Sequence, residues 1–303
     1  MPAPITSTDE LRARRRRLPQ WVRLCLMLTP AGMVVATFMV GGFAGTITQS
    51  LGHQPYLAES HLSLNAYRDL WHDQAVRASL ALTCRVAFFS TLTAATLGVA
   101  VAMLLRDLGR SRAWIAHLLQ STIAVPHIVG ALCMLLLFSQ SGFLSRIVHG
   151  LGLSADPTTF PSVTNDAFGW SIIAEYVWKE TPFLTLIVLA SLAGVREREN
   201  VARTLGAGNL QRFFHVTLPA IAPSLVAGSV LVFAYAANAY EVPSILGRPY
   251  PATLPVVALQ LFTSADLTSR PEAMAVAVMI TVLTCAIVAL YYSALARLTR
   301  RPL

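Results

Sequence analysis

The sequence predicts an all-α protein whose helices cross a membrane six times. Of its 303 residues, 55% are hydrophobic and only 13% are charged, and the mean hydropathy is +0.58, whereas soluble domains are about a quarter charged. Its apolar segments run to roughly 20 residues or more, which is long enough to cross about 30 Å of hydrocarbon as helices. These segments alternate too little for barrel strands, and helices and closed barrels are the structures that span bilayers.

Six apolar segments are the expected spans. The first follows the basic run RARRRR, and it differs from a signal peptide because its apolar region exceeds the usual length of roughly 7 to 15 residues. We therefore expect it to remain as a membrane anchor. The spans are expected at about Trp21 to Thr48, Ala75 to Leu105, Ala113 to Gln140, Phe168 to Gly194, Ala220 to Val242 and Pro271 to Leu298.

Arginine is unevenly distributed over the segments that connect these spans. The arginines of the two tails and of the second-to-third and fourth-to-fifth connections are Arg12, Arg14, Arg15, Arg16, Arg17, Arg106, Arg110, Arg112, Arg196, Arg198, Arg203, Arg212, Arg300 and Arg301. The connections on the opposite side hold only Arg68, Arg146, Arg248 and Arg270. Because basic residues gather in cytoplasmic segments, we expect both termini to be cytoplasmic.

The remaining composition excludes several classes of function. A formal net charge of +8 is explained by this topology and by attraction to anionic headgroups, so no nucleic-acid partner is expected. The four cysteines are Cys25, Cys84, Cys133 and Cys285, which fall in predicted spans without metal-ligand spacing. No Gly-rich phosphate loop, HExxH or nucleophile elbow occurs in the sequence. We therefore expect no catalytic residue, metal or cofactor, and uphill transport would draw on a gradient or a partner.

A polar stretch, RERENVARTLGAGNLQRFFHVTLP, separates the fourth and fifth spans. The spacing of its apolar residues, Val201, Leu205, Leu210, Phe213 and Phe214, predicts two short amphipathic helices. Gly206 and Gly208 separate these helices, since glycine allows the positive φ that ends a helix. Pro219 suits the first turn of the next span. The stretch is either a connector that lies on headgroups or a handle for a partner outside the bilayer.

This stretch resembles the cytoplasmic signature of the permease subunits of bacterial binding-protein-dependent ABC importers. That signature reads Glu-Ala-Ala, three residues, Gly, nine residues, an aliphatic residue, one residue and Leu-Pro. The matching positions are Ala202, Gly206, Val216, Leu218 and Pro219. Two positions depart from it, because Asn200 replaces the Glu and Val201 replaces the first Ala, although Glu199 places a carboxylate one residue away.

The resemblance extends over most of the chain and implies the type I importer fold in the bacterial inner membrane. It gives a basic cytoplasmic tail at 1–20, a first transmembrane helix and external loop at 21–70, and a permease core at 71–300 with a coupling hairpin at 195–218. The implied partners are ABC ATPase subunits, a second permease subunit and an extracytoplasmic solute-binding protein. A heterodimer of permeases is favoured over a homodimer, and ATP hydrolysis resides in the ATPase, so this chain is not expected to be an enzyme.

The resemblance also implies roles for the residues of the hairpin, which would sit in a groove of the ATPase. Gly206 would set the angle of the hairpin, Ala202 would permit close approach, and Glu199, Arg203 and Arg212 would form a polar rim. The implied ATPase-coupling residues are Glu199, Asn200, Ala202, Arg203, Gly206, Arg212, Leu218 and Pro219.

Ionisable residues within membrane spans are costly, so they usually face protein or water. The candidates for lining a translocation path are Arg85, Glu175, Lys179 and Glu241. Glu175 and Lys179 are four residues apart with the Glu on the N-terminal side, so they can pair on one face of a helix. Either such residues line the path, or they lock helices together near Pro182, which leaves a backbone carbonyl unpaired one turn earlier.

The transported solute is expected to be small and polar. Residues 240–275, YEVPSILGRPYPATLPVVALQLFTSADLTSRPEAMA, resemble the corresponding region of permeases for polyamines, a group that also includes opine, phosphonate and ferric-iron importers. A polyamine is the first choice. Glu175 and Glu241 suit a cation, whereas Lys179 and Arg85 do not.

Two other classes of function are weighed against an importer subunit. A gradient-driven secondary transporter, the main alternative, typically shows internal repeats with broken helices at corresponding positions, and no duplication relates the first and last three spans. A membrane-embedded enzyme needs converging His, Asp or Cys side chains. The histidines are dispersed, with His53, His61, His72 and His149 outside, His117 and His127 in the third span and His215 in the cytoplasm.

Overall fold

The computed structural model describes residues 19–54, 61–106, 108, 111–153, 160–161 and 163–299. The chain divides into two compact units, residues 1–48 and 49–303. Throughout the described ranges the regular elements are helices and none is a strand, which confirms the all-α prediction. Most of the predicted basic tail, together with Arg110, Arg300 and Arg301, lies outside the described residues.

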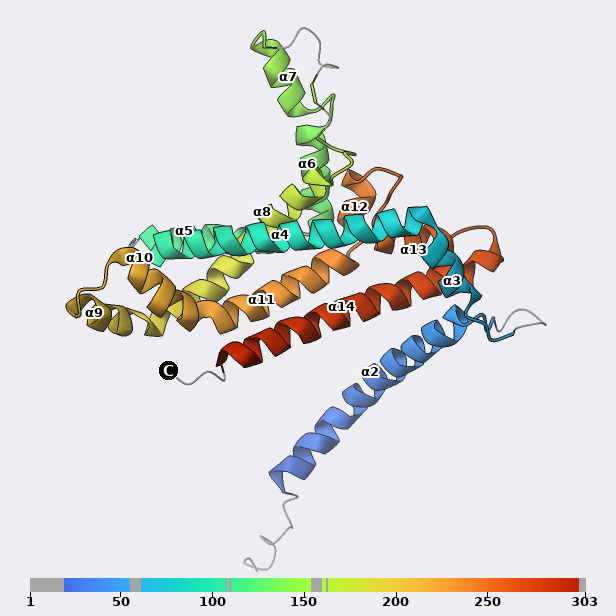
Figure 1. The fold of residues 1–303 in the computed structure, drawn as a ribbon, viewed down its shortest axis with the longest axis horizontal. Coiled ribbons are helices and arrows are strands. Elements are labelled where there is room, and N and C mark those ends of the chain that lie inside the picture. The colour runs from blue at the N-terminus through green and yellow to red at the C-terminus, as the bar shows by residue number, and fades with distance from the viewer. Residues whose placement is uncertain are drawn as a thin grey trace, which may run out of the picture. The chain divides into compact units, whose positions relative to one another are not determined.

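The helices follow one another along the chain as Figure 1 labels them. In order they are α2 (Gln20–Ser50), α3 (Asn65–His72), α4 (Gln74–Arg106), α5 (Ser111–Ile123), α6 (His127–Phe138), α7 (Phe143–Gly150), α8 (Trp170–Ser191), η2 (Leu192–Gly194), α9 (Arg196–Thr204), α10 (Asn209–Arg212), the π-helical turn η3 (Phe213–Thr217), α11 (Leu218–Asn238), α12 (Glu241–Leu246), α13 (Leu254–Phe262), η4 (Leu267–Ser269) and α14 (Arg270–Thr299).

The first unit is formed by α2, which confirms a helix at the first predicted span. Its 31 residues correspond to about 46 Å at about 1.5 Å per residue, more than the hydrocarbon thickness of a bilayer. Within this unit, none of residues 19–48 is buried. A helix that is apolar on all sides and has no packed face is suited to lipid.

The second unit is a bundle in which α4 packs most extensively on α8 and also contacts α11. Ser90, Ala94, Gly98 and Ala102 are buried and four residues apart, so they form a stripe of small side chains on one face of α4. A Cβ atom on Gly98 would lie only 3.0 Å from the Cβ of Leu184 in α8. Small residues thus let the two backbones approach closely, as in other membrane helix pairs.

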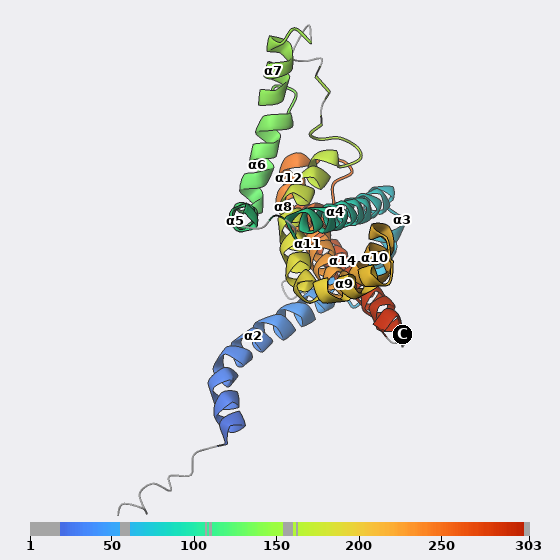
Figure 2. The ribbon, with the colours of Figure 1, turned by 90° about the vertical axis from the view of Figure 1, so that its left-hand side faces the viewer.

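The third predicted span, Ala113 to Gln140, is wrong as a single helix. α5 ends at Ile123 and α6 begins at His127, after Pro126 with φ −61° and ψ 142°. Proline lacks an N–H and disfavours the helical conformation at the residue before it, so the helix is interrupted here. Both views show α6 and α7 leaving the bundle across the direction of α4 (Figures 1 and 2).

The later spans follow the prediction with one correction. α8 and η2 cover the fourth, and α14 covers the sixth. α11 begins at Leu218 with Pro219 in its first turn, as expected. Because α11 ends at Asn238, Glu241 does not end the fifth span but begins the short helix α12 after a break.

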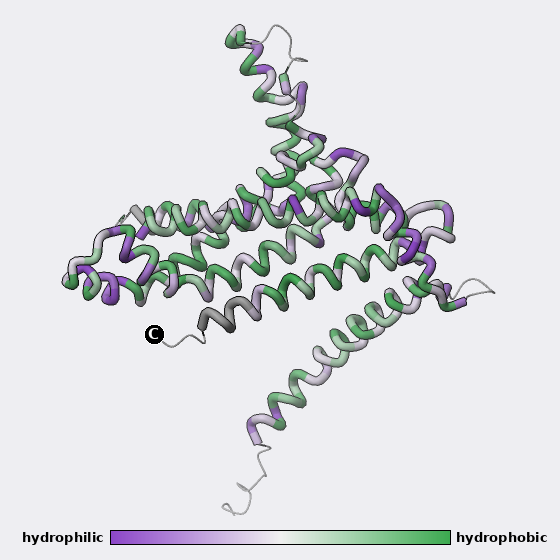
Figure 3. Tube along the Cα trace, in the orientation of Figure 1, coloured by the Kyte–Doolittle hydropathy of each residue, from purple (hydrophilic) through white to green (hydrophobic). Residues whose placement is uncertain are grey.

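Six segments of the described chain are long and apolar enough to cross a membrane, which confirms the predicted number. They are Gln20–Ser50, Gln74–Arg106, His127–Gly150, Trp170–Gly194, Asn209–Asn238 and Leu267–Ser293. In the second unit, hydrophilic residues gather at α9 and α10 and at the opposite end around α3, whereas the long helices between them are mostly hydrophobic (Figure 3).

Candidate functional site

Residues 195–218 form the predicted helical hairpin, which consists of α9, α10 and the π-helical turn that leads into α11. Gly206 ends α9 with φ +87°, which confirms the expected positive φ. The Gly206 N–H donates to the Arg203 carbonyl and the Ala207 N–H donates to the Ala202 carbonyl, both at 3.0 Å. This is the paired hydrogen-bond pattern of a Schellman motif, so the turn angle is fixed by backbone geometry at a glycine.

Glu199 lies on the inner face of α9, with only 7% of its surface exposed. Arg106 Nη1, at the end of α4, donates to Glu199 Oε1 at 2.8 Å and to Oε2 at 3.0 Å. Thr217 Oγ1 also donates to Oε1. Burial raises the pKa of this carboxyl, but the hydrogen bonds from Thr217 and Arg106 outweigh burial, so the pKa lies below its ordinary value.

Glu199, which was predicted for the polar rim of the hairpin, is therefore buried and paired within this chain. Its carboxylate points inward because Arg106, at the end of α4, and Thr217, directly before α11, both donate to it. Three segments far apart in the sequence are joined at this one carboxylate. Glu199 thus fixes the hairpin to the second and fifth spans.

A cavity of about 490 Å³ lies between the hairpin and the end of α4. Asn200, Arg203 and Arg212, which were predicted to meet an ATPase, all contribute to its lining. Arg106 and Arg196 line it as well. These polar residues of the hairpin thus face the cavity, whereas Glu197 and Arg198 of the same helix do not line it.

The outer side of the hairpin carries exposed apolar residues beside the charged Glu197 and Arg198. Val201 is 61% exposed, Leu205 83%, Leu210 76% and Phe214 56%. The predicted amphipathic pattern is confirmed, but its apolar side points away from the bundle. Leu218 and Pro219, by contrast, belong to the first turn of α11 and set where the hairpin joins the fifth span.

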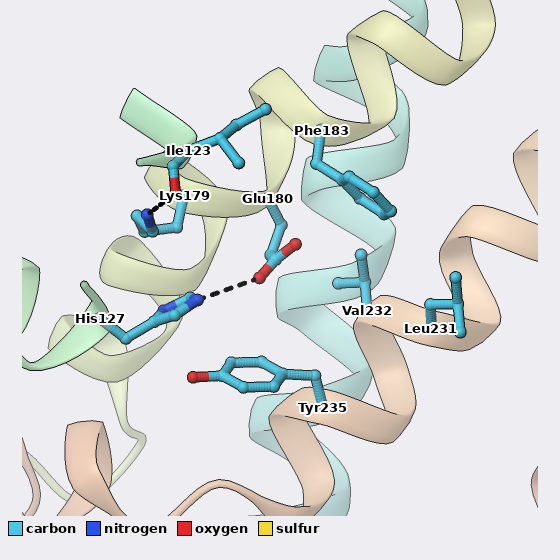
Figure 4. Close-up of a pocket in the computed structure, with 8 residues that line it drawn as sticks. All are labelled: Ile123, His127, Lys179, Glu180, Phe183, Leu231, Val232 and Tyr235. Carbon is cyan, nitrogen blue, oxygen red and sulfur yellow. Dashed lines mark hydrogen bonds and ion pairs between the residues drawn. The ribbon is translucent and has the colours of Figure 1, made fainter. Parts of the chain in front are cut away.

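A second polar site lies inside the bundle, at the break between α5 and α6 (Figure 4). A cavity of about 240 Å³ is lined there by His127 from α6, by Lys179 and Glu180 from α8, and by Tyr235 from α11. Apolar residues complete the lining. The discontinuity of the third span is therefore what brings these polar groups together.

Lys179 does not pair with Glu175, which corrects the expected i, i+4 ion pair. Its ammonium donates to the carbonyl oxygens of Thr122 at 2.8 Å and Ile123 at 3.3 Å, and also to that of Val125. These carbonyls lie at the end of α5 and directly after it, where no further helical turn provides donors. A cation also complements the negative end of a helix dipole.

Glu175 lies instead against His127 at the start of α6. Its side chain is fully buried, and Oε1 lies 3.3 Å from His127 Nδ1. His127 Nε2 is 3.6 Å from Glu180 Oε1. A Cβ atom on Gly130 would come within 2.8 Å of Glu175 Oε1, so the missing side chain at that position makes room for the carboxylate. One histidine is therefore held between two carboxylates of α8.

Lys179 lines this cavity, but the other three residues predicted for the path, Glu175, Arg85 and Glu241, do not. Arg85 reaches the Ala167 carbonyl at 3.4 Å and stacks over the Phe168 ring at 4.9 Å. Glu241 accepts a hydrogen bond from the Tyr240 N–H at 3.2 Å. Sequence reasoning missed His127 and Tyr235 as members of the site, and the signal that could have found His127 is Pro126 directly before it.

The hairpin, with its turn at Gly206 and its junction at Leu218 and Pro219, lies within a stretch of the chain that matches a known protein family. Residues 94–301 match the family described as binding-protein-dependent transport system inner membrane component. The chain belongs to this family. Its resemblance to ABC importer permeases is thereby confirmed, and the gradient-driven transporter is set aside.

Curated relatives place this permease among proteins with varied solutes. It is 28% identical over 258 residues to the trehalose/maltose transport system permease protein of Thermococcus litoralis, covering 81% of this chain and 83% of that protein. It is 27% identical over 217 residues to the putrescine transport system permease protein of Escherichia coli, covering 71% and 70% of the two chains.

The fold of this permease is shared with a solved transporter. A chain of a bacterial ABC transporter involved in the import of the acidic polysaccharide alginate superposes with a TM-score of 0.76. The match covers 92% of this chain and 96% of that chain at 17% sequence identity. At this identity the likeness establishes the importer permease fold and nothing about the solute.

Proposed function

We propose that this permease forms one half of the membrane pathway of an ATP-driven importer and that its hairpin couples it to a separate ATPase. The observation that carries this proposal is the outer face of the hairpin. Val201 and Leu205 are exposed there, in the segment between the candidate spans Trp170–Gly194 and Asn209–Asn238. Exposed apolar side chains outside the spans are typical of a surface that meets a partner, which favours a handle over a connector.

The hairpin is suited to transmit movement because it is held at both ends. Gly206 fixes the turn, and Glu199 ties α9 to the ends of α4 and α11. When the ATPases close on ATP, an element fixed in their groove carries the movement to the spans. The nucleotide shifts the equilibrium between inward and outward access only through its different affinities for the two states.

The arginine distribution supports a cytoplasmic hairpin with both termini on the same side, because Arg196, Arg198, Arg203 and Arg212 gather in it. The ATPase then docks from the cytoplasm and a solute-binding protein docks from the opposite face. The alginate transporter has been solved in complex with an oligosaccharide-bound periplasmic protein, which supports the same arrangement here. The second permease subunit is a different chain, as is common in importers of this group.

The polar cavity at the break in the third span is proposed as part of the translocation path. Broken helices at the level of the bilayer often mark the solute site of a transporter. Because the charge of Lys179 is engaged by the end of α5, the carboxylate of Glu180 leaves the cavity suited to a cation. A polyamine is therefore the first choice of solute, and the putrescine permease among the relatives supports it. Opines, phosphonates and ferric iron are the alternatives.

The decisive experiment is co-purification of the complete transporter, followed by ATPase assays in lipid with loaded solute receptors. Putrescine or spermidine is expected to stimulate ATP hydrolysis, whereas maltose and molybdate are not. Gly206→Asp is expected to abolish solute uptake while the protein still inserts into the membrane. Full uptake and full ATPase association in Gly206→Asp would show that the hairpin is only a connector. Stimulation by maltose or molybdate alone would contradict the cationic solute.

A further inference from the structure

The cavity of about 490 Å³ between the hairpin and α4 is strongly basic. Its described lining sets four arginines against a single carboxylate. That carboxylate, Glu199, is already engaged by Arg106 and Thr217. Arg203 and Arg212 bring further positive charge, and neither forms an ion pair with another described residue. The cavity therefore favours an anion.

Arg212 also has a donor that lacks an acceptor. One of its terminal nitrogens, Nη2, donates to Asn209 Oδ1, but its Nε is buried and has no hydrogen-bond partner in the described part of the chain. Leaving a buried donor unsatisfied is costly, and an oxyanion in the cavity would accept from it. Arginine presents its donors in a planar fork that fits phosphate oxygens in pairs.

The cavity and the outer face of the hairpin are separate surfaces. Arg196, Glu199, Asn200 and Arg203 follow the i, i+3, i+4, i+7 spacing of a single helix face, and all four line the cavity. Val201 and Leu205 do not line it and are exposed. An ATPase bound to the apolar face would thus leave the basic cavity available to a second ligand.

The position of the cavity relative to the spans points to the kind of ligand. Arg106 is the last residue of α4, and Thr217 directly precedes α11, so the cavity lies where two spans end. We propose that it binds the phosphate group of an anionic lipid headgroup. This inference rests on the proposed cytoplasmic position of the hairpin, because that leaflet carries a negative surface potential and basic pockets between spans bind acidic headgroups there.

Such a headgroup would act on coupling as well as on stability. It would bridge Arg203 and Arg212 across the two helices of the hairpin while Arg106 holds Glu199 beside them. A ligand that binds the folded hairpin stabilises it by mass action. The angle of the hairpin relative to α4 would then depend on the lipid composition of the membrane.

The test uses the full-length chain, purified in detergent with the subunits that co-purify with it. Thermal unfolding is followed during titration with dioctanoyl phosphatidylglycerol, dioctanoyl phosphatidylcholine or inorganic phosphate. The double variant Arg203→Gln/Arg212→Gln is expected to weaken the apparent affinity for phosphatidylglycerol by at least about tenfold, since charge-assisted hydrogen bonds are lost. Arg198→Gln is the matched control, because Arg198 lies in α9 but does not line the cavity.

A second variant tests whether the ligand bound in the cavity is negatively charged. Asn200→Glu adds a carboxylate to the cavity and is expected to weaken phosphatidylglycerol binding without removing an arginine. Stabilisation by inorganic phosphate at similar concentrations would assign the site to free phosphate rather than to lipid and would overturn the headgroup proposal. Equal binding of phosphatidylcholine, or an unchanged affinity in the double variant, would overturn it as well.

The ATPase is the competing source of an anion. If the double variant loses ATPase association while its affinity for phosphatidylglycerol is unchanged, the cavity receives an acidic side chain of the ATPase and the headgroup proposal fails. Failure of the importer proposal has a different signature, namely full ATPase association and full uptake in Gly206→Asp. Phosphatidylglycerol binding is measured separately from both readouts.

Discussion

Arg106, the last residue of α4, and Glu199, in the middle of α9, form an ion pair in which a single arginine nitrogen lies 2.8 Å and 3.0 Å from the two carboxylate oxygens. The two residues are 93 positions apart in the sequence. Their pairing connects the second span to the hairpin directly, without passing through the fourth span. Movement of the hairpin is therefore expected to reach α4 through this contact.

The first prediction concerns this ion pair and its dependence on pH. The folded-state pKa of Glu199 lies below its ordinary value of 4.5, so its stabilisation is complete above pH 4.5 and is lost as the pH falls below that value. Glu199→Gln is expected to cost about 1.5–3 kcal/mol near neutral pH. The difference in thermal unfolding between wild type and variant is expected to shrink in acid.

Glu197→Gln is the control for that measurement, since Glu197 is on the same helix and is exposed. It is expected to change stability by less than about 0.5 kcal/mol, as is usual for exposed positions. A Glu199→Gln variant as stable as Glu197→Gln at neutral pH would contradict the role of Glu199 as the brace of the hairpin.

The second prediction uses two glycines of the same turn. Gly206 has φ +87°, whereas Gly208 has φ −68°, and a Cβ atom at either position would meet nothing within 4 Å. Gly206→Ala is therefore expected to strain the turn by about 1 kcal/mol or more through its backbone alone. Gly208→Ala is expected to be neutral. Amide hydrogen exchange in α9 and α10 measures the difference, and equal protection in both variants would contradict it.

The third prediction concerns Lys179 and Glu175. Lys179 donates to the end of α5 while Glu175 lies against His127, so the two side chains do not pair with each other. Lys179→Met and Glu175→Gln are each expected to destabilise the protein by about 1–3 kcal/mol, and the double variant is expected to lose roughly the sum. Thermal unfolding of the wild type, the two single variants and the double variant forms a double-mutant cycle. A double variant more stable than either single variant would instead indicate that Lys179 and Glu175 form a direct ion pair.

The fourth prediction concerns the contact between α4 and α8. A Cβ atom at Gly98 would lie 3.0 Å from Leu184 Cβ and 3.2 Å from the Thr185 nitrogen. Gly98→Ala is therefore expected to separate the helices and to cost about 1–3 kcal/mol by overpacking. Gly150→Ala, in α7, adds a methyl group with nothing within 4 Å and serves as the control. Unfolding measurements that show equal stability for the two variants would contradict the close approach.

The fifth prediction concerns the proposed topology. Reporter fusions after Gln211 and at Leu303 are expected to report a cytoplasmic location, because arginine is concentrated in those segments. Fusions at His61 and Pro251 are expected to report the external side. An external location for Gln211 would separate the hairpin from the ATPase and would contradict the proposed coupling.

The sequence alone determined the parts of this protein that depend on local pattern. The length and continuity of the apolar runs determined six membrane-crossing segments, because the bilayer requires a fixed length of hydrocarbon-compatible helix. Gly206 and Pro219 indicated the hairpin because each has a local backbone role, and the family was identified from the resemblance of this stretch to a known signature. The break at Pro126 could also be read locally, although an apolar run on both sides concealed it.

Only the tertiary structure decided which charges meet. Helical spacing permitted a pair between Glu175 and Lys179, but Lys179 found the unpaired carbonyls of α5, which are visible only once the third span is broken and packed on α8. Glu199 likewise turned inward because Arg106 lies beside it in space. Long-range partners of a charged side chain depend on how the helices pack, and periodicity along a single helix carries no information about the charge on its neighbour.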